Sequence, residues 1–312
     1  MKKILMSVVA VSVAAWSLAV SGEVGASSGA CPGGACEFNA AAKAARFHMR
    51  SIAHRGLHGP GIAQNSVEGF TAAWANGVKW IETDFHLLKD GRVLCVHDRG
   101  ELKRISGEDR VIADLTAAEV AKIDIGKFAK TERPVRMPYI EDVLATVPKD
   151  CIAQCEIKLY GDTYADTFDA ARRAAGLSET NILVTSFNAD WLKDFKRRYP
   201  KYQTGWLGAK VSSKKQAKPG ANTVNVPQIV EIAKDAGVDI VCPGAASAMK
   251  AGLSPKDADA IRAAGFDFRL YGVNSPKALA YALKVKATAF TCDHWKDSFE
   301  WAKSIPGLNL TP

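Results

Sequence analysis

Beyond its first 20 residues the chain contains no apolar run long enough to cross a membrane, and no linker or change of composition divides it. No expected helix carries a continuous basic stripe and no recognised nucleic-acid motif occurs, although 41 Lys and Arg against 33 Asp and Glu leave a formal charge of +8. Because this charge is spread along the chain, small acidic substrates explain it as well as nucleic acid or an anionic membrane would. These absences favour one large domain and a small anionic partner.

The single long apolar run lies at the start of the chain. Lys2 and Lys3 precede an apolar run over residues 4–20, and small residues follow at once, with cleavage sites offered at 24–26 and 21–22. This arrangement predicts a signal peptide over residues 1–26 and an exported protein, periplasmic or secreted. The alternative is an uncleaved membrane anchor, since about 17 apolar residues could just span a bilayer.

Residues 27–47 are rich in Ser, Gly and Ala, which predicts a flexible leader into a domain over residues 48–312. Cys31 and Cys36 in this leader could close a small disulfide loop in an exported protein, whereas a thiol metal clip would need a second cysteine pair. The total of seven cysteines is odd. Cys151 and Cys155 on one expected strand would lie about 13 Å apart, so part of the set should be buried free thiols.

In the domain, strand-like runs alternate with helical patterns. Strands are expected at residues 51–54, 78–84, 151–158, 182–187, 203–208, 239–244, 267–274 and 287–293. Helices are expected at 66–76, 140–147, 163–175, 190–199, 227–236, 256–264 and 276–283. Eight strands alternating with helices favour an α/β fold of the (β/α)8 TIM-barrel type. A doubly wound open sheet would also alternate, but it gives no reason for chemistry at so many strand ends.

Residues 51–98 concentrate groups that can do chemistry at the ends of strand-like runs. His54 and Arg55 end the first run, and a later run, 93–96, leads to His97. Glu82 and Asp84 alternate on one face of the second strand, about 6.6 Å apart. Carboxylates hold hard cations, arginine binds phosphate and histidines transfer protons, so the set suits metal-assisted phosphoryl chemistry.

The third strand adds a further charged pair. Glu156 and Lys158 lie on one face near its C-terminal end, where the strands of a barrel converge on one mouth. Charged residues that end a buried barrel strand need partners. Glu156 therefore joins Glu82 and Asp84 as a third oxygen ligand for a divalent cation, and Lys158 can balance phosphate charge.

The order of these motifs closely resembles the glycerophosphodiester phosphodiesterase family of the PLC-like phosphodiesterase superfamily. The chain reads HRG at 54–56, AQNS at 63–66, ETD at 82–84, KDG at 89–91, HD at 97–98 and EIK at 156–158. The family shows HRG, PENT, ExD, TKDG, HD and EIK. The chain departs at Leu88 and at Gln64, where the family has glutamate, but Asn65 remains. The family also carries an insertion at the place of residues 99–138 that shapes its substrate pocket.

The resemblance implies hydrolysis of a glycerophosphodiester to sn-glycerol 3-phosphate and an alcohol with one divalent cation, Mg²⁺ or Ca²⁺, with Mn²⁺ a further candidate. It implies that His54 and His97 transfer protons. It also implies two sets of binding residues: Glu82, Asp84 and Glu156 for the metal, and Arg55, Lys158, Asn65 and Tyr271 for the substrate. Neither the division of labour between the histidines nor the nucleophile, water or the substrate's own hydroxyl, is fixed by the motifs.

The later strands resemble the family more loosely, at TSFN (185–188) and YGVN (271–274). Phe187, Trp206 and Tyr271 would stand as aromatic walls around the mouth, or else cap the core. Asp293 ends the eighth strand, where the family often has T-D, and could equally cap the next helix. A second insertion, 209–225, places Lys210, Lys214, Lys215 and Lys218 either to steer an anionic substrate or in a solvated loop.

Three rival functions stay open. A relative of the same fold could cleave lysophospholipid or sphingolipid head groups in the manner of a phospholipase D. A glycoside hydrolase could use two carboxylates about 6.6 Å apart, although the histidine pair and Arg55 argue against it. A binding module without catalytic activity is the third. The sequence leaves the oligomeric state open.

Overall fold

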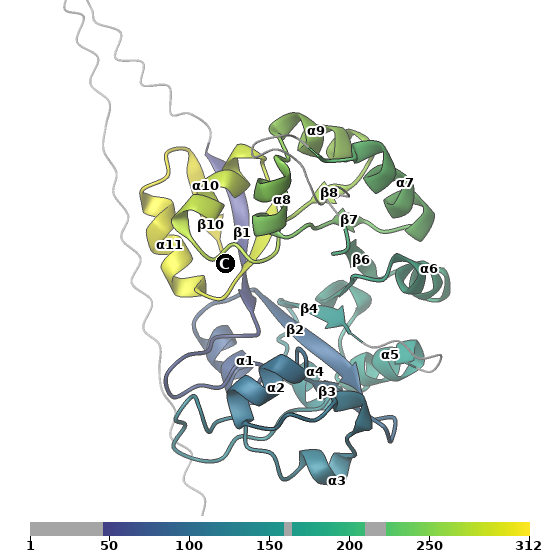
Figure 1. Ribbon diagram of the computed structural model, residues 1–312, viewed down its shortest axis with the longest axis vertical. Coiled ribbons are helices and arrows are strands. Elements are labelled where there is room, and N and C mark those ends of the chain that lie inside the picture. Colours follow the sequence, from purple (N-terminus) through teal and green to yellow (C-terminus); the bar gives the residue numbers. More distant parts are fainter. Residues whose placement is uncertain (1–45, 159–163, 210–222) are drawn as a thin grey trace, which may run out of the picture. The chain divides into compact units, whose positions relative to one another are not determined.

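The computed structural model describes residues 46–158, 164–209 and 223–312, which belong to the compact unit Lys43–Pro312 (Figure 1). The expected signal peptide, most of the leader with Cys31 and Cys36, and the four lysines of the second insertion lie outside the described residues. Among the helices that are described, none has the length and apolar character needed to span a bilayer.

Eight parallel strands of the described ranges form a nearly closed barrel. They are β1 (Phe47–His54), β2 (Trp80–Leu87), β4 (Ile152–Ile157), β5 (Ile182–Ser186), β6 (Gln203–Trp206), β7 (Ile240–Val241), β8 (Asp267–Phe268) and β9 (Ala289–Cys292). From β1 to β8, strands that are neighbours in this list pair in parallel, and β9 pairs in parallel with β1. A bridge between Leu270 and Phe290 joins the chain after β8 to β9. The prediction of a TIM barrel is confirmed.

Helices follow the strands on the outside of the barrel, where α5, α6 and α7 lie in sequence (Figure 1). The seven expected helices are α1 (Val67–Ala75), α4 (Ile140–Ala145), α5 (Tyr164–Ala174), α6 (Ala189–Arg198), α7 (Val226–Ala236), α9 (Pro255–Ala263) and α10 (Pro276–Lys284). Side chains start several of them, as when Ser66 Oγ accepts the Gly69 N–H at the start of α1. Outside the insertion that follows β3, two helices of the described ranges were not predicted, α8 (Ala245–Ala251) and α11 (Trp295–Lys303).

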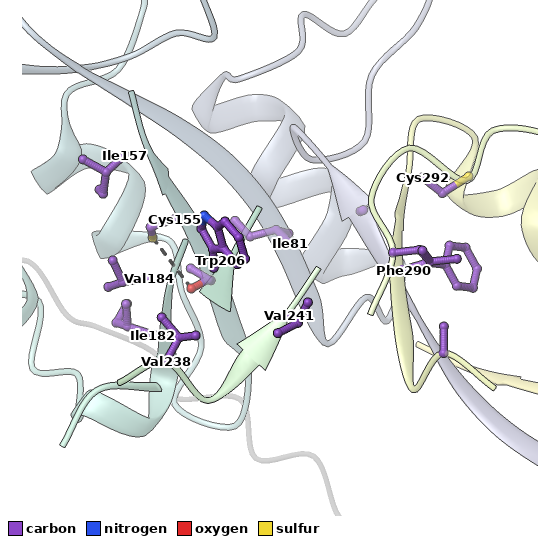
Figure 2. Packing of buried hydrophobic residues seen from close by; sticks show 14 of the residues in the cluster. Ile81, Cys155, Ile157, Ile182, Val184, Trp206, Val238, Val241, Phe290 and Cys292 are labelled. Atoms are coloured by element: carbon purple, nitrogen blue, oxygen red, sulfur yellow. Dashed lines mark hydrogen bonds between the residues drawn. The ribbon is translucent and has the colours of Figure 1, made fainter. Parts of the chain in front are cut away.

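Alternation along β2 separates the core from the site. Ile81 and Phe85 face outward into the large cluster beneath the helices, part of which is drawn in Figure 2. Trp80 faces inward, against an apolar cluster of Leu183, Leu207, Ile240 and Cys242 that fills the barrel. Because Glu82 and Asp84 share the inward face of Trp80, they stand above that apolar filling, at the mouth.

The start of one strand differs from expectation, and the structure decides between the two alternatives for Trp206. β1 begins at Phe47, four residues earlier than predicted, because β10 (Leu308–Thr311) pairs with its first half, Phe47↔Leu308 to Arg50↔Thr311. Trp206 is not a wall of the mouth: it is 5% exposed, packs in the core (Figure 2) and donates its indole N–H to the Phe187 carbonyl at 3.2 Å. The five cysteines of the described ranges are buried free thiols, as predicted.

The insertion after β2 has its own small core. β3 (Val93–Cys95) pairs antiparallel with β2. It leads into α2 (Arg99–Ser106), a 3-10 turn (Ile112–Asp114) and α3 (Ala117–Val120). Leu94, Leu102, Leu115 and Met137 are among the residues of a separate hydrophobic cluster there. This packing fixes α2 beside the barrel mouth, where Glu101 and Asp98 reach the site described next.

Candidate active site

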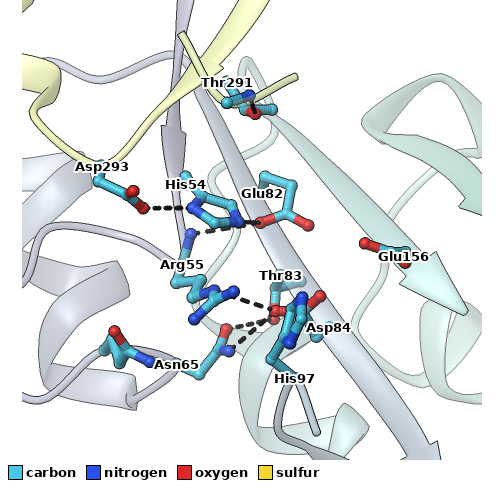
Figure 3. Close-up of polar contacts among 12 residues, drawn as sticks. His54, Arg55, Asn65, Glu82, Thr83, Asp84, His97, Glu156, Thr291 and Asp293 are labelled. Atoms are coloured by element: carbon cyan, nitrogen blue, oxygen red, sulfur yellow. Dashed lines mark hydrogen bonds and ion pairs between the residues drawn. The ribbon is translucent and has the colours of Figure 1, made fainter. Parts of the chain in front are cut away.

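Strand pairing brings the charged residues of the mouth together. His54 on β1 lies beside Glu82 on β2, and Asp84 on β2 lies beside Glu156 on β4. The three carboxylates are buried, with exposed fractions of 2%, 0% and 6% for Glu82, Asp84 and Glu156. Figure 3 shows their side chains facing the same space as those of His54 and His97. The sequence-predicted histidines and carboxylates therefore do share one site.

His54 at the end of β1 is bonded to a carboxylate that follows β9, the last strand of the barrel. Its Nδ1 bonds Asp293 Oδ1, while its Nε2 lies 3.6 Å from Glu82 Oε2 (Figure 3). Asn274 also donates to Asp293. Burial would raise the pKa of Asp293, but the bond to His54 and the nearby charges of His54, His58 and Arg55 together outweigh it and lower the pKa to about 2. Asp293 does not cap α11, whose N-cap is His294, so that alternative is wrong.

His97 has a similar arrangement on the opposite side of Asp84. Its Nδ1 lies 2.6 Å from Asp98 Oδ2, and Asp98 also caps α2 by accepting the Glu101 N–H at 2.7 Å. Burial, with Lys158 and Arg55 nearby, lowers the pKa of His97 to about 4. The imidazole is therefore neutral near pH 7, with Nε2 left to accept a proton or hold a metal.

Arg55 and Asn65 lie in the left-handed region, with φ of 60° and 50°, which non-glycine residues seldom adopt. Arg55 Nε lies 3.5 Å from Asp84 Oδ2, and its backbone N–H donates to Glu82 Oε2 at 3.3 Å. Asn65 Nδ2 donates to Asp84 Oδ2 at 3.0 Å (Figure 3). The strained backbone thus turns both side chains onto one carboxylate, an arrangement typical of functional sites.

Lys158 lies between two carboxylates. Its Nζ is 2.6 Å from Glu156 Oε1 and 3.2 Å from Asp84 Oδ1. Burial favours the neutral form of both acids, but Lys158 and its neighbours hold the pKa of Asp84 below its usual value. At Glu156 burial prevails and raises the pKa to about 7, and at Glu82 burial together with Asp84 and Glu156 also raises the pKa. The site therefore carries more buried acid than its cations compensate.

A candidate cation site lies among these acids. Ligand atoms of Asp84, His97 and Glu156 all lie within 4.8 Å of one another. Asp84 Oδ1 and Glu156 Oε1 are buried, and both share the single ammonium group of Lys158. Glu82 is outside this group, because its carboxylate faces His54 and the Arg55 N–H. Buried carboxylate oxygens that share one ammonium group suit a hard cation such as Mg²⁺ or Ca²⁺.

Aromatic side chains line the mouth beside Lys158. The rings of Phe187 and Tyr271 meet edge to face with centroids 5.7 Å apart, and Lys158 Nζ lies 5.9 Å from the Phe187 centroid. Phe187 is 46% exposed. The pair offers an apolar surface next to the charged groups, as the sequence suggested for these two residues.

One residue of the site was not predicted. Glu101 on α2 is 1% exposed and lies within hydrogen-bond distance of Arg55 Nη1 at 3.4 Å. Its spacing after Asp98 is that of a capping box, which indicates a helix start rather than a buried charge. The sequence therefore gave no sign that Glu101 turns into the mouth.

Comparisons with known proteins agree with this geometry. Residues 54–296 match the profile of the Glycerophosphoryl diester phosphodiesterase family. A glycerophosphodiester phosphodiesterase of Caldanaerobacter subterraneus is 30% identical over 162 residues, which are 50% of this chain and 65% of that protein. The match thus spans less than two thirds of the relative's length.

Solved structures share the fold at low identity. A glycerophosphodiester phosphodiesterase from Parabacteroides distasonis superposes with a TM-score of 0.66 at 19% identity, covering 83% of this chain and 98% of that one. An Oleispira antarctica phosphodiesterase in complex with the product sn-glycerol-3-phosphate superposes with a TM-score of 0.65 at 18% identity, covering 81% and 96%. With a profile match that spans most of the barrel, the chain belongs to the glycerophosphoryl diester phosphodiesterase family.

Proposed function

We propose that the protein hydrolyses a glycerophosphodiester to sn-glycerol 3-phosphate and an alcohol with the help of a divalent cation. The observation that carries this proposal is the gathering, at one barrel mouth, of buried carboxylates, two cations and two histidines that are each bonded to an aspartate. Family membership supports the reaction, and the product bound to the Oleispira antarctica neighbour supports the substrate class.

A divalent cation fits the charge of the site. Arg55 and Lys158 face four buried carboxylates, those of Glu82, Asp84, Glu101 and Glu156. With all four ionised, two negative charges would have no counter-charge, and such buried charge is costly, which is why the pKa values of Glu82 and Glu156 are raised in the absence of a cation. We propose Glu82, Asp84 and Glu156 as the ligands; Asp84 and Glu156 already belong to the candidate cation site, and Glu82 would join them by turning away from His54. A bound cation would supply electrostatic stabilisation of the phosphate oxygens.

The two histidines are the proposed proton-transfer pair. An aspartate accepts from Nδ1 of each, so the neutral imidazoles carry their proton on Nδ1 and keep a lone pair on Nε2. One Nε2 would take a proton from the nucleophile, and the other imidazole, once protonated, would give one to the leaving alkoxide. His97 also lies in the candidate cation site, so its role as a ligand is tested by metal binding to His97→Ala.

Arg55 and Lys158 would bind the phosphate, because both cations face the space beside Asp84 that the histidines share. Asn65 would hold Asp84 in place, and Tyr271 with Phe187 would contact the non-phosphate part of the substrate. The nucleophile is water or a neighbouring hydroxyl of the substrate. An analogue without that hydroxyl is turned over only by the water route.

We also propose that the protein is exported after cleavage near residue 26, on the basis of its N-terminal charge and apolar run. N-terminal sequencing of the native protein from its cell of origin tests this. An intact N-terminus would defeat the export proposal and leave the catalytic one untouched.

The deciding experiment for the reaction is an assay of the purified protein against several glycerophosphodiesters and a lysophospholipid, with and without EDTA. We expect turnover of a glycerophosphodiester, loss of turnover with EDTA, and recovery with Mg²⁺, Ca²⁺ or Mn²⁺. Turnover that survives EDTA would remove the metal from the proposal. Preference for the lysophospholipid would move the substrate class, and no turnover at all would leave a binding protein.

A further inference from the structure

Glu101 is the meeting point of four donors from three parts of the chain. Its Oε1 accepts from Arg55 Nη1 at 3.4 Å, from Asn65 Nδ2 at 3.3 Å and from the Gln64 amide. Its Oε2 accepts from the backbone N–H of His97. A carboxylate that is 1% exposed needs such partners, and here each partner is, or adjoins, a residue of the proposed active site.

The chain departs from the family motif beside this carboxylate. Gln64 stands where the resembled family has glutamate, and the Gln64 amide donates to Glu101. Two carboxylates in these positions would repel each other in a buried environment, whereas two amides would leave Arg55 with one counter-charge fewer. The contact therefore accommodates one negative charge, and in this chain position 101 supplies it.

We propose that Glu101 is a positioning residue, and that its negative charge holds Arg55, Asn65 and the His97 backbone in their working geometry while the Gln64 amide supports it. The inference rests on the proposed function. It explains how Arg55 and Asn65 keep left-handed backbone conformations: the same carboxylate accepts from both side chains.

The test is a charge exchange between the two positions. Glu101→Gln removes the negative charge from the contact, and Gln64→Glu adds a second one. The double variant Gln64→Glu/Glu101→Gln again has one negative charge, now at position 64 instead of position 101. Each variant is assayed for kcat and KM on a glycerophosphodiester, for affinity toward sn-glycerol 3-phosphate by calorimetry, and for Tm. Glu141→Gln is the matched control, since Glu141 is 49% exposed and pairs with Arg92 at the surface.

We expect Glu101→Gln to lower kcat/KM by about 10- to 100-fold, as is typical when a residue that orients a site residue is lost. Product affinity should fall with it, because Arg55 is no longer held. The double variant should recover at least tenfold over Glu101→Gln, while Glu141→Gln stays within about twofold of the parent. A purely structural Glu101 would instead lower Tm and leave kcat and KM of the folded fraction unchanged.

Two results would overturn the inference. One is a Glu101→Gln variant with parental kcat/KM and product affinity. The other is a double variant no better than Glu101→Gln or, should that variant not fold, no better than Gln64→Glu. Failure of the proposed function looks different, because the parent protein itself would then turn over no glycerophosphodiester.

Discussion

Two clusters of buried charge in this barrel differ in how completely they are satisfied. In the Asp169 cluster, formed by Asp169 and Arg172 on α5 and Tyr202 before β6, Asp169 Oδ1 accepts from Arg172 Nη2 at 2.9 Å and from Tyr202 at 2.7 Å. No polar side-chain atom of these three residues is buried without a partner. At the mouth, Asp84 Oδ1 and Glu156 Oε1 share the single ammonium group of Lys158, at 3.2 and 2.6 Å, and the buried acids outnumber the cations.

The difference separates stability from function. Paired and hydrogen-bonded charge is part of the fold, and breaking it destabilises the protein. Buried charge that lacks a full counter-charge in the protein is instead available to a ligand, here a cation and a phosphate. Substitutions in the Asp169 cluster should therefore lower stability and leave kcat unchanged. Substitutions at the mouth should lower kcat or metal affinity and leave the protein folded.

The largest effect is expected at the histidines of the mouth. His54→Ala and His97→Ala should each lower kcat by about 10²- to 10⁴-fold, because each removes a proton-transfer group, with metal affinity retained. A nitrophenyl phosphodiester needs little protonation of its leaving group, so the variant that lacks the acid should recover on it and the variant that lacks the base should not. Near-parental turnover of an alkyl diester by both variants would show the pair to be structural.

The next largest effect is expected at the carboxylates of the mouth, whose substitution should lower metal affinity and, in one case, raise the Tm. Glu82→Gln, Asp84→Asn and Glu156→Gln should each fold and lose metal affinity by at least about tenfold, with activity partly rescued by excess metal. Glu82→Gln should also raise the Tm of the metal-free protein, because it removes a carboxyl group whose negative charge is disfavoured by burial and by the neighbouring Asp84 and Glu156. Calorimetry with metal and melting in EDTA measure the two. Unchanged metal affinity in all three would contradict the ligand assignment.

A smaller effect, on stability rather than on turnover, is expected in the Asp169 cluster. Asp169→Ala leaves the buried Arg172 guanidinium without its carboxylate, so the free energy of unfolding should fall by about 3 kcal/mol. Urea unfolding measures this, and kcat of the folded enzyme should not change. Loss of kcat at constant stability would mean that the two clusters are coupled.

The stability that Asp169 contributes depends on pH in a definite direction. Burial alone would raise the pKa of Asp169, but hydrogen bonds from Tyr202 and Arg172 hold it below its ordinary value. Its contribution is therefore complete above the unfolded pKa of about 3.9 and is lost as the pH falls toward the lower folded pKa. The gap between parent and variant should be constant from pH 5 to 7 and narrow below about pH 4.

The smallest effect is expected where charge is exposed. Lys79 and Asp150 form a surface pair, with side chains 45% and 70% exposed. Asp150→Asn should leave Tm and kcat unchanged within error, because water screens such pairs. A clear drop in Tm would show that pairing, rather than burial, separates the clusters.

How far the sequence predicted the site follows from the range of each contact. Glu82, Asp84, Glu156 and Lys158 could be placed because strand alternation fixes which residues share a face. Glu101 could not, because its contacts to Arg55 and Asn65 depend on how α2 packs on the insertion core. The bond between His54 and Asp293 joins residues 239 apart, and only the closed barrel brings them together.

The fold was predicted with the same limits. The barrel followed from eight alternating strands, but α8 and β10 did not. The sequence of α8, AASAMKA, has only 7 residues and is mostly alanine, so it is too short and too uniform to show the period that marks an amphipathic helix. The four residues of β10 pair only with the first half of β1, at a distance in the chain that local pattern does not register.

The bond between His54 and Asp293 also links the kinetics of folding to the gain of activity. The first and last strands of the barrel carry one residue each, so the His54 ring acquires its orienting partner only when β9 docks on β1. Contacts of such long sequence separation form late, since closing a long loop precedes any gain from them. During refolding, helical circular dichroism should therefore recover ahead of turnover, and the appearance of turnover reports the moment at which the two edges of the sheet meet.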